Sequence, residues 1–121
     1  MGIMGILKYC LYAFNGEMLC FTHALLNALH LRSKDYDVTI VIEGTATKLI
    51  KTFHEEHDNP YYSLYKKVKE AGLISAVCKA CATKMGAIES ARAEKLPIKG
   101  DMNGHPSIHT YIEKGYHIIT F

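Results

Sequence analysis

The chain has 121 residues and a mass of 13.6 kDa. Single domains are commonest between about 100 and 150 residues, so we expect one domain over residues 1–121. Hydrophobic residues make up 49% of the chain and charged residues 21%, and the mean hydropathy is 0.00. These values exclude a disordered tail, a collagen-like fibre and a membrane bundle.

Charge and hydropathy along the chain also limit its partners and location. The formal charge is +2, and the basic residues are scattered among acidic ones, so we expect no nucleic-acid partner. The longest uncharged stretch, Met18 to Leu31, is shorter than the roughly 18 apolar residues that cross a bilayer, so we expect no membrane partner. No basic residue precedes the apolar run from Met1 to Leu7 and no small-residue cleavage site follows it, so we expect a mature, cytoplasmic chain.

Strand-like and helix-like segments alternate along the whole sequence. Apolar or β-branched runs predict strands, and apolar residues at a spacing of three or four predict helices. The predicted strands cover residues 7–14, 38–42, 73–77, 96–98 and 116–121. The predicted helices cover residues 18–33, a short segment around 47–53, 60–71, 78–95 and 106–114.

This alternation predicts an α/β protein with a three-layer, flavodoxin-like fold. We expect a five-stranded parallel sheet in the order 2-1-3-4-5 with helices on both faces. In that order the winding reverses between strands one and three, and ligands bind at their carboxyl ends. The crevice would place the loop of Asn15 and Gly16 opposite Cys78. We therefore assign Asn15 and Gly16 to substrate binding.

The cysteines offer the main candidates for chemistry. Cys10, Cys20, Cys78 and Cys81 are too few and too unevenly spaced for a secreted disulfide framework. Cys78 and Cys81 form a C-x-x-C motif where a predicted strand meets a predicted helix. The helix N-terminus and Lys79 should lower the pKa of Cys78 more than that of Cys81. Cys10 lies inside a doubly covered strand, and we expect it in the core.

The sequence resembles a known family in two places. These are Ala-Gly-Leu-Ile-Ser-Ala-Val-Cys-Lys-Ala-Cys-Ala (71–82) and Glu-Lys-Gly-Tyr-His-Ile-Ile-Thr-Phe (113–121), and both resemble the DsrE/DsrF-like proteins. The resemblance extends in outline over nearly the whole chain. It implies a flavodoxin-like sheet and assembly as trimers or hexamers. It also implies a sulfur-relay role in which the cysteine matching Cys78 carries persulfide sulfur, whereas Cys81 stands where sulfur-relay members commonly have a small residue.

The leading hypothesis is therefore a sulfur-transfer protein, with the question of a true sulfurtransferase enzyme left open. Cys78 and Cys81 are the candidate catalytic residues, and Lys79 and His105 join Asn15 and Gly16 as candidate substrate-binding residues. His105 follows the fourth predicted strand and so belongs on the same rim as Cys78. The expected partners are sulfur donor and acceptor proteins or small thiols, and no cofactor or metal is assigned.

Two alternatives remain open at this level. Cys81 could resolve a mixed disulfide on Cys78, which would make the protein a dithiol–disulfide oxidoreductase. Cys78 and Cys81, with Cys20 and His23 one helical turn apart, could instead hold zinc or an iron–sulfur cluster. The last strand, at 116–121, should form an apolar sheet edge, so we expect a homo-oligomer.

Overall fold

The computed structural model describes residues 6–121 and confirms the α/β class. Residues 1–5, the greater part of the N-terminal apolar run, lie outside the described residues. The strands are β1 (Lys8–Ala13), β2 (Asp37–Ile42), β3 (Ile74–Cys78), β4 (Ile98–Lys99) and β5 (Tyr116–Thr120). The helices are α1 (Met18–Ser33), the 3-10 turn η2 (Gly44–Thr47), α2 (Lys48–Glu55), α3 (Tyr62–Glu70), α4 (Lys79–Lys84), α5 (Ile88–Ala93) and α6 (Ile108–Glu113).

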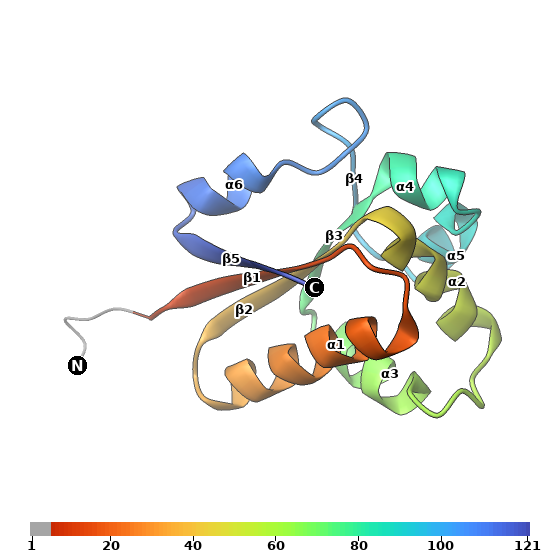
Figure 1. Ribbon diagram of the computed structural model, residues 1–121, viewed down its shortest axis with the longest axis horizontal. Coiled ribbons are helices and arrows are strands. Elements are labelled where there is room, and N and C mark those ends of the chain that lie inside the picture. Colours follow the sequence, from red (N-terminus) through yellow and green to blue (C-terminus); the bar gives the residue numbers. More distant parts are fainter. Residues whose placement is uncertain (1–5) are drawn as a thin grey trace.

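The five strands form one all-parallel sheet, as expected for a flavodoxin-like layout (Figure 1). The order within the sheet is β4-β3-β2-β1-β5, and it differs from the expected 2-1-3-4-5. β2 lies between β1 and β3, so the expected crevice between β1 and β3 is not formed. The last strand is at a sheet edge, as predicted, and it pairs with β1.

The observed order follows from the handedness of parallel crossovers. From β1 to β4 the chain moves in one direction across the sheet, and right-handed connections then place α1 to α5 on one face. The step from β4 to β5 reverses the direction and places α6 on the other face. Figure 1 shows α1 and α3 on one side of the sheet and α6 on the other. Sequence periodicity identifies the strands but does not say which of them are neighbours, so it did not fix this order.

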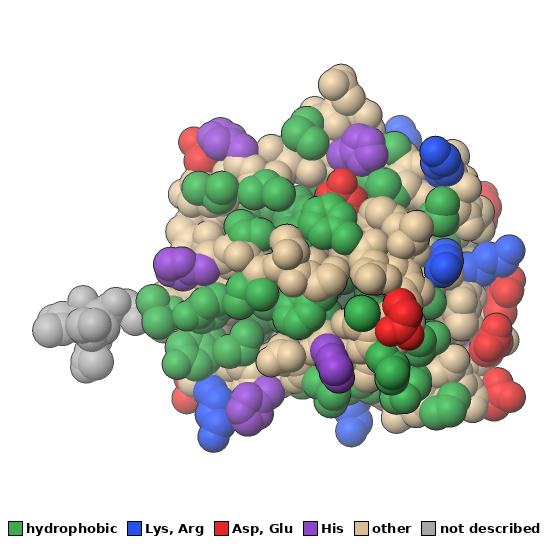
Figure 2. Space-filling model, in the orientation of Figure 1, with side chains coloured by type: hydrophobic (Ala, Val, Ile, Leu, Met, Phe, Trp, Pro, Cys, Tyr) green, Lys and Arg blue, Asp and Glu red, His purple; other side chains and the backbone are tan. Residues whose placement is uncertain are grey.

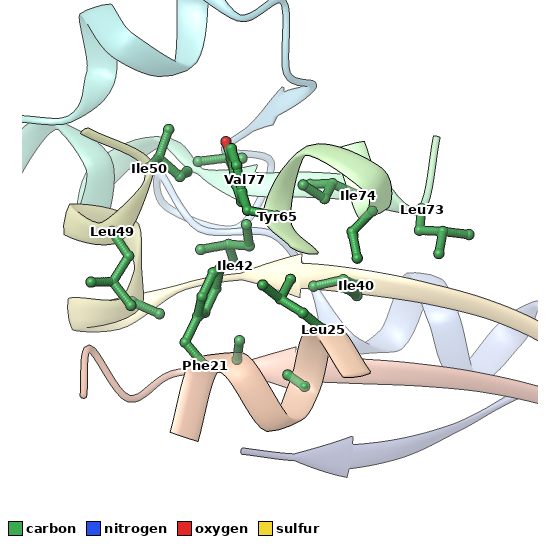
Figure 3. Close-up of a cluster of buried hydrophobic side chains, with 14 of the residues drawn as sticks. Phe21, Leu25, Ile40, Ile42, Leu49, Ile50, Tyr65, Leu73, Ile74 and Val77 are labelled. Atoms are coloured by element: carbon green, nitrogen blue, oxygen red, sulfur yellow. The ribbon is translucent and has the colours of Figure 1, made fainter. Parts of the chain in front are cut away.

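Alternate residues of the strands divide the core into two clusters. The larger cluster joins one face of the sheet to α1, α2, α3, α4 and α5. Figure 3 shows Phe21 and Leu25 of α1 pointing toward Ile40 and Ile42 of β2. The smaller cluster, on the opposite face, contains Cys10, Tyr12, Val41, Ala76 and Tyr111. One face is therefore covered by most of the helices, and the other mainly by α6.

The predicted helix over 78–95 is two short helices in the structure. α4 ends at Lys84 and α5 begins at Ile88, with Gly86 between them at a φ of +71°. That backbone conformation suits glycine and ends a helix. The helical spacing of Met85, Ile88 and Ala91 in the sequence therefore spans the break between α4 and α5, which the sequence pattern did not show. Within residues 6–121, no helix has both the length and the apolar character needed to cross a membrane.

Candidate functional site

Parallel strand ends bring the candidate site together at one edge of the sheet. Cys78 is the last residue of β3, and Glu43 directly follows β2. Ile42 and Val77 are register partners, so the next residues, Glu43 and Cys78, leave the sheet side by side. This is the carboxyl edge, where ligands bind in open α/β sheets.

His105 reaches the same place from the loop after β4. Two backbone hydrogen bonds pair Met102 with His105, at 2.8 and 2.9 Å, and the Ala80 N–H donates to the Gly104 carbonyl at 2.9 Å. Gly104 has a φ of +93°, and an added Cβ would lie 3.1 Å from Cβ of Ala80. A glycine is therefore required for the loop of residues 100–105 to lie this close to α4.

Four potential ligand or proton-transfer groups converge on this edge. Cys78 Sγ lies 3.0 Å from His105 Nδ1, and Cys81 Sγ lies 3.7 Å from the same nitrogen. Glu43 Oε2 lies 3.4 Å from His105 Nδ1. One atom from each of the four side chains falls within 4.8 Å of all the others. The sequence-predicted residues Cys78, Cys81 and His105 are thus brought together, with Glu43 added.

The Cys78 thiol is buried, and burial governs its acidity. Its side chain has no exposed surface, and desolvation raises its pKa to about 12, an effect that the Cys81 side chain strengthens. The Cys81 backbone N–H donates to Cys78 Sγ at 3.3 Å and acts in the opposite direction. The expectation that the helix N-terminus would lower the pKa of Cys78 is therefore wrong, because burial outweighs the single N–H contact.

Glu43 and His105 are the more accessible members of the group. The Glu43 side chain is 14% exposed and that of His105 is 38% exposed. Desolvation raises the pKa of Glu43, while the neighbouring His105 opposes the rise. His105 therefore forms the solvent-facing cover of the buried Cys78, with a carboxylate behind it.

Asn15 and Gly16 lie in a turn that supports α1. The Asn15 side-chain oxygen accepts from the Glu17 N–H at 2.8 Å, and the Gly16 N–H donates to Thr45 Oγ1 at 2.9 Å. A Cβ on Gly16 would lie 2.6 Å from the Thr45 carbonyl oxygen, so close packing requires this glycine. Thr45 belongs to η2, which contacts α4. The turn thus contacts a neighbour of the site, and no hydrogen bond within residues 6–121 joins it to Cys78.

The other sequence-selected residues take no part in the cluster. Lys79 begins α4 with its side chain exposed, and the described residues give it no ion pair. Cys20 and His23 lie on α1, where Cys20 neighbours the Glu17 carboxylate. Neither belongs to a potential metal-ligating group in the described part of the chain. Cys10 lies in the core, as expected.

Glu43 is the site residue that sequence reasoning missed. It directly follows the apolar run of β2, a position that marks the carboxyl edge of a parallel sheet. In the expected order, β1 separated β2 from β3, which kept Glu43 apart from Cys78. The observed order makes β2 and β3 neighbours, and Glu43 then lies beside Cys78.

A cavity of about 520 Å³ borders the loop that carries His105. It lies on the α6 face of the sheet, and its lining includes Thr39, Ser75, Asp101 and Tyr111. Ser75 Oγ and the Tyr111 hydroxyl are 2.8 Å apart. The loop over residues 100–107 therefore contributes to this cavity through Asp101 and to the cysteine cluster through His105.

Comparison with known proteins gives a family match over most of the chain. The model of the DsrE/DsrF-like family matches residues 22–121. An uncharacterized protein of Methanocaldococcus jannaschii is 36% identical over 103 residues, which cover 85% of this chain and 81% of that protein. No solved structure matches the chain. The matched region contains Cys78, Cys81, His105 and Glu43.

Proposed function

Because the chain belongs to the DsrE/DsrF-like family, we propose that it is a sulfur-relay carrier that holds sulfane sulfur as a persulfide on Cys78. The observation that carries this proposal is the 3.0 Å approach of His105 Nδ1 to Cys78 Sγ. A histidine at that distance is placed to accept the thiol proton. It supplies the activation that burial of Cys78 alone would oppose.

The transfer leaves the total oxidation state of sulfur unchanged. His105 takes the Cys78 proton, and the thiolate attacks the outer sulfur of a persulfide or polysulfide donor. A bond forms between Cys78 Sγ and that sulfur, the donor's own sulfur–sulfur bond breaks, and the donor leaves as a thiol after regaining a proton. An acceptor thiolate later attacks the outer sulfur on Cys78. The bond between Cys78 Sγ and that sulfur breaks, and Cys78 is released as the thiolate.

The surroundings of Cys78 suit storage of sulfur. The Cys81 N–H already donates to Cys78 Sγ, and His105 in its protonated form would pair with the persulfide anion. Since Cys78 is buried and His105 is its partly exposed cover, a donor reaches Sγ when the His105 side chain moves aside. Small thiols or the exposed cysteine of a partner protein fit this approach.

Sulfur loading can be tested by intact mass. The reduced protein is treated with a polysulfide donor, desalted and measured beside Cys78→Ser and Cys81→Ser. We expect the mass of added sulfur on wild type and on Cys81→Ser, and none on Cys78→Ser. Added sulfur on Cys78→Ser that equals wild type would refute the assignment.

A second function is supported by the position of Cys81. Its Sγ lies within 4.8 Å of Cys78 Sγ, so the pair could cycle between dithiol and disulfide as an oxidoreductase. Cys81 thiolate could also attack Cys78 Sγ in the loaded form, forming the disulfide and releasing hydrosulfide. In the same experiment this function predicts a wild type that loses two hydrogens without gaining sulfur.

We also propose that the protein acts as a homo-oligomer, a trimer or a hexamer. β5 is an edge strand, and exposed apolar side chains lie on it and on α6, including Ile112 at 57% and Ile119 at 42% exposure. Figure 2 shows hydrophobic side chains gathered over the area where Figure 1 shows β1 and β5. An unpaired apolar edge favours association. Light scattering should give a mass several times 13.6 kDa, and a monomer at micromolar protein would contradict this.

A further inference from the structure

We propose that Glu43, Cys78, Cys81 and His105 form a binding site for a divalent zinc-type metal ion. The proposal goes beyond sulfur transfer and does not depend on it. It rests on the number, chemistry and spacing of the four side chains. They come from three separate strand ends, after β2, β3 and β4.

The spacing of the four groups fits a tetrahedral site. With Zn–S near 2.3 Å and Zn–N and Zn–O near 2.1 Å, a tetrahedron places S and N about 3.6 Å apart and N and O about 3.4 Å apart. The corresponding distances here are 3.0 and 3.7 Å from the two sulfurs to His105 Nδ1, and 3.4 Å from Glu43 Oε2 to the same nitrogen. No two of the four atoms are more than 4.8 Å apart, so shifts of about 1 Å or less would bring all four around one ion.

Three potential ligand atoms lie around His105 Nδ1: two sulfurs and one carboxylate oxygen. One imidazole nitrogen takes part in one good hydrogen bond, as donor or as acceptor, so it can serve only one of the three atoms well. A cation at the centre would instead bind the nitrogen, the carboxylate oxygen and, once the two thiols have given up their protons, both sulfurs.

The donor set selects the class of metal. Two thiolates, an imidazole and one carboxylate are typical of zinc, and oxygen-seeking ions such as Mg²⁺ and Ca²⁺ do not prefer sulfur. The surrounding backbone helps to hold the ligands in place. The Cys81 N–H contacts Cys78 Sγ, and the loop bearing His105 is fastened by the Met102–His105 bridge and by the bond from Ala80 to Gly104.

Metal binding and sulfur loading would compete for Cys78. In the occupied site both thiols are deprotonated and bound to the ion, so Cys78 Sγ is not free to attack a sulfur donor. The ion would keep the unloaded thiols reduced and unreactive, and a chelator or a competing sulfur ligand would release them. The same four side chains would then have two states: a metal-bound state in which sulfur transfer is blocked, and a metal-free state in which Cys78 can accept sulfur.

The test uses the full chain, reduced and freed of metal by a chelator that is then removed. Co²⁺ serves as the spectroscopic probe and Zn²⁺ as its competitor. We expect one Co²⁺ per chain, with thiolate-to-cobalt absorption and the visible bands of a tetrahedral ion, all displaced by Zn²⁺. No binding at equimolar micromolar concentrations, or an octahedral spectrum without thiolate absorption, would overturn the proposal.

Variants identify the ligands. Cys81→Ser and His105→Ala should each weaken Zn²⁺ binding by about 100-fold or more, because even the partners behind metal ligands are typically worth 10- to 100-fold. Glu43→Gln tests the carboxylate and should weaken binding by about tenfold or more. Cys20→Ser and His109→Ala, which alter a cysteine and a histidine outside the cluster, should bind as wild type does. If Glu43→Gln and His105→Ala each bind Zn²⁺ as tightly as wild type does, the four-ligand site is refuted.

A separate measurement keeps this proposal distinct from the sulfur-carrier function. Wild-type protein is treated with the polysulfide donor with and without one equivalent of Zn²⁺, and the added sulfur is measured. Loading that Zn²⁺ suppresses and a chelator restores would support competition at one site. Binding of Zn²⁺ with undiminished loading would refute competition, and failure to load with intact Zn²⁺ binding would refute the carrier function alone.

Discussion

Cys10 and Cys78 are both fully buried, and burial raises the pKa of each to about 12. Their surroundings nevertheless differ completely. Cys10 lies inside β1, in a cluster of apolar and aromatic side chains, and desolvation is the sole cause of its raised pKa. Cys78 ends β3, where His105, Cys81 and Glu43 approach it.

The comparison shows that position along a strand decides what a buried thiol can do. Inside a strand, backbone groups are used in the sheet, and the neighbours of Cys10 are residues of the same sheet and of α6. At the carboxyl edge, loops after three strands converge and bring polar side chains from distant parts of the sequence. Both thiols are buried, but only Cys78 has polar side chains close enough to take part in a reaction.

Cys10 and Cys78 should differ most in how fast each is alkylated in the native protein. Cys10 becomes accessible only on global unfolding, which costs about 5–15 kcal/mol in typical domains. Cys78 requires only that the loop of residues 100–105 open, and local openings cost less than global ones. Iodoacetamide labelling followed by peptide mass spectrometry should therefore modify Cys78 about 10³-fold or more faster than Cys10. Comparable rates at the two cysteines would remove the basis of the comparison.

The second prediction concerns alkaline stability and Cys10. Its pKa is about 12 in the folded protein against an ordinary value of 9.0, so the folded state holds this proton more tightly. The resulting stability is fully present below pH 9 and is lost as the pH rises toward 12, by up to about 4 kcal/mol. Urea unfolding under reducing conditions should show that Cys10→Ala loses roughly 1 kcal/mol less than wild type between pH 7 and pH 10.

Tyrosines also titrate at alkaline pH, and those whose raised pKa does not depend on Cys10 provide the internal control for that measurement. Burial and Glu94 raise the pKa of Tyr65, and since Cys10 is not among the causes, this contribution is the same in both proteins and cancels in the difference. Parallel stability curves for wild type and Cys10→Ala from pH 7 to pH 10 would show that the Cys10 proton is not held by burial.

The third prediction tests the group that sets Cys78 apart. His105→Ala removes the proton acceptor 3.0 Å from Cys78 Sγ, and positioned acid–base groups typically contribute at least about 100-fold. Sulfur loading of metal-free protein, followed by quenched mass spectrometry, should slow by about this factor. His109→Ala is the matched control because its histidine lies on α6 and faces Glu113. Equal slowing in both variants would mean that the loss is not specific to His105.

The smallest effect is expected from loosening the loop of residues 100–105 that lies over Cys78. Gly104→Ala introduces a side chain at a φ of +93° against Ala80, which should destabilise the closed loop by about 1–2 kcal/mol. Alkylation of Cys78 should then rise roughly 5- to 30-fold. Gly72→Ala carries similar backbone strain at a φ of +71° with nothing within 4 Å of the added Cβ, and should leave Cys78 alkylation near the wild-type rate. An equal rise in both variants would exclude loop opening as the route to Cys78.

The sequence was enough to predict the strands, most helices and the place of Cys78 at a strand end. These features depend on local patterns, such as the apolar run before Cys78 and the glycines that follow α3, α4 and α6, which are Gly72, Gly86 and Gly115. His105 was also predictable, because it follows a strand and shares the rim of a parallel sheet. The neighbours of each strand were not predictable, because strand order depends on packing between distant segments. Glu43 was missed for that reason, and the crevice expected between β1 and β3, with Asn15 and Gly16 opposite Cys78, does not form because β2 lies between these strands.

The pKa of Cys78 was mispredicted for a related reason. A helix N-terminus and Lys79 are visible in the sequence, whereas the fold of the loop of residues 100–105 over the thiol is not. That loop is fixed by contacts such as the bond from the Ala80 N–H to the Gly104 carbonyl, between residues 24 positions apart. Burial by this loop outweighs the local helix contact at Cys78.

The most direct test of the central claim is to locate the sulfane sulfur after a single loading. Reduced, metal-free protein receives one equivalent of a persulfide donor, is blocked with an alkylating agent that preserves persulfides, and is digested for peptide mass spectrometry. We expect one added sulfur on the peptide that contains Cys78, with Cys10 and Cys20 unmodified by sulfur. Added sulfur found only on Cys81 or Cys20, or equally on Cys10 and Cys78, would contradict it.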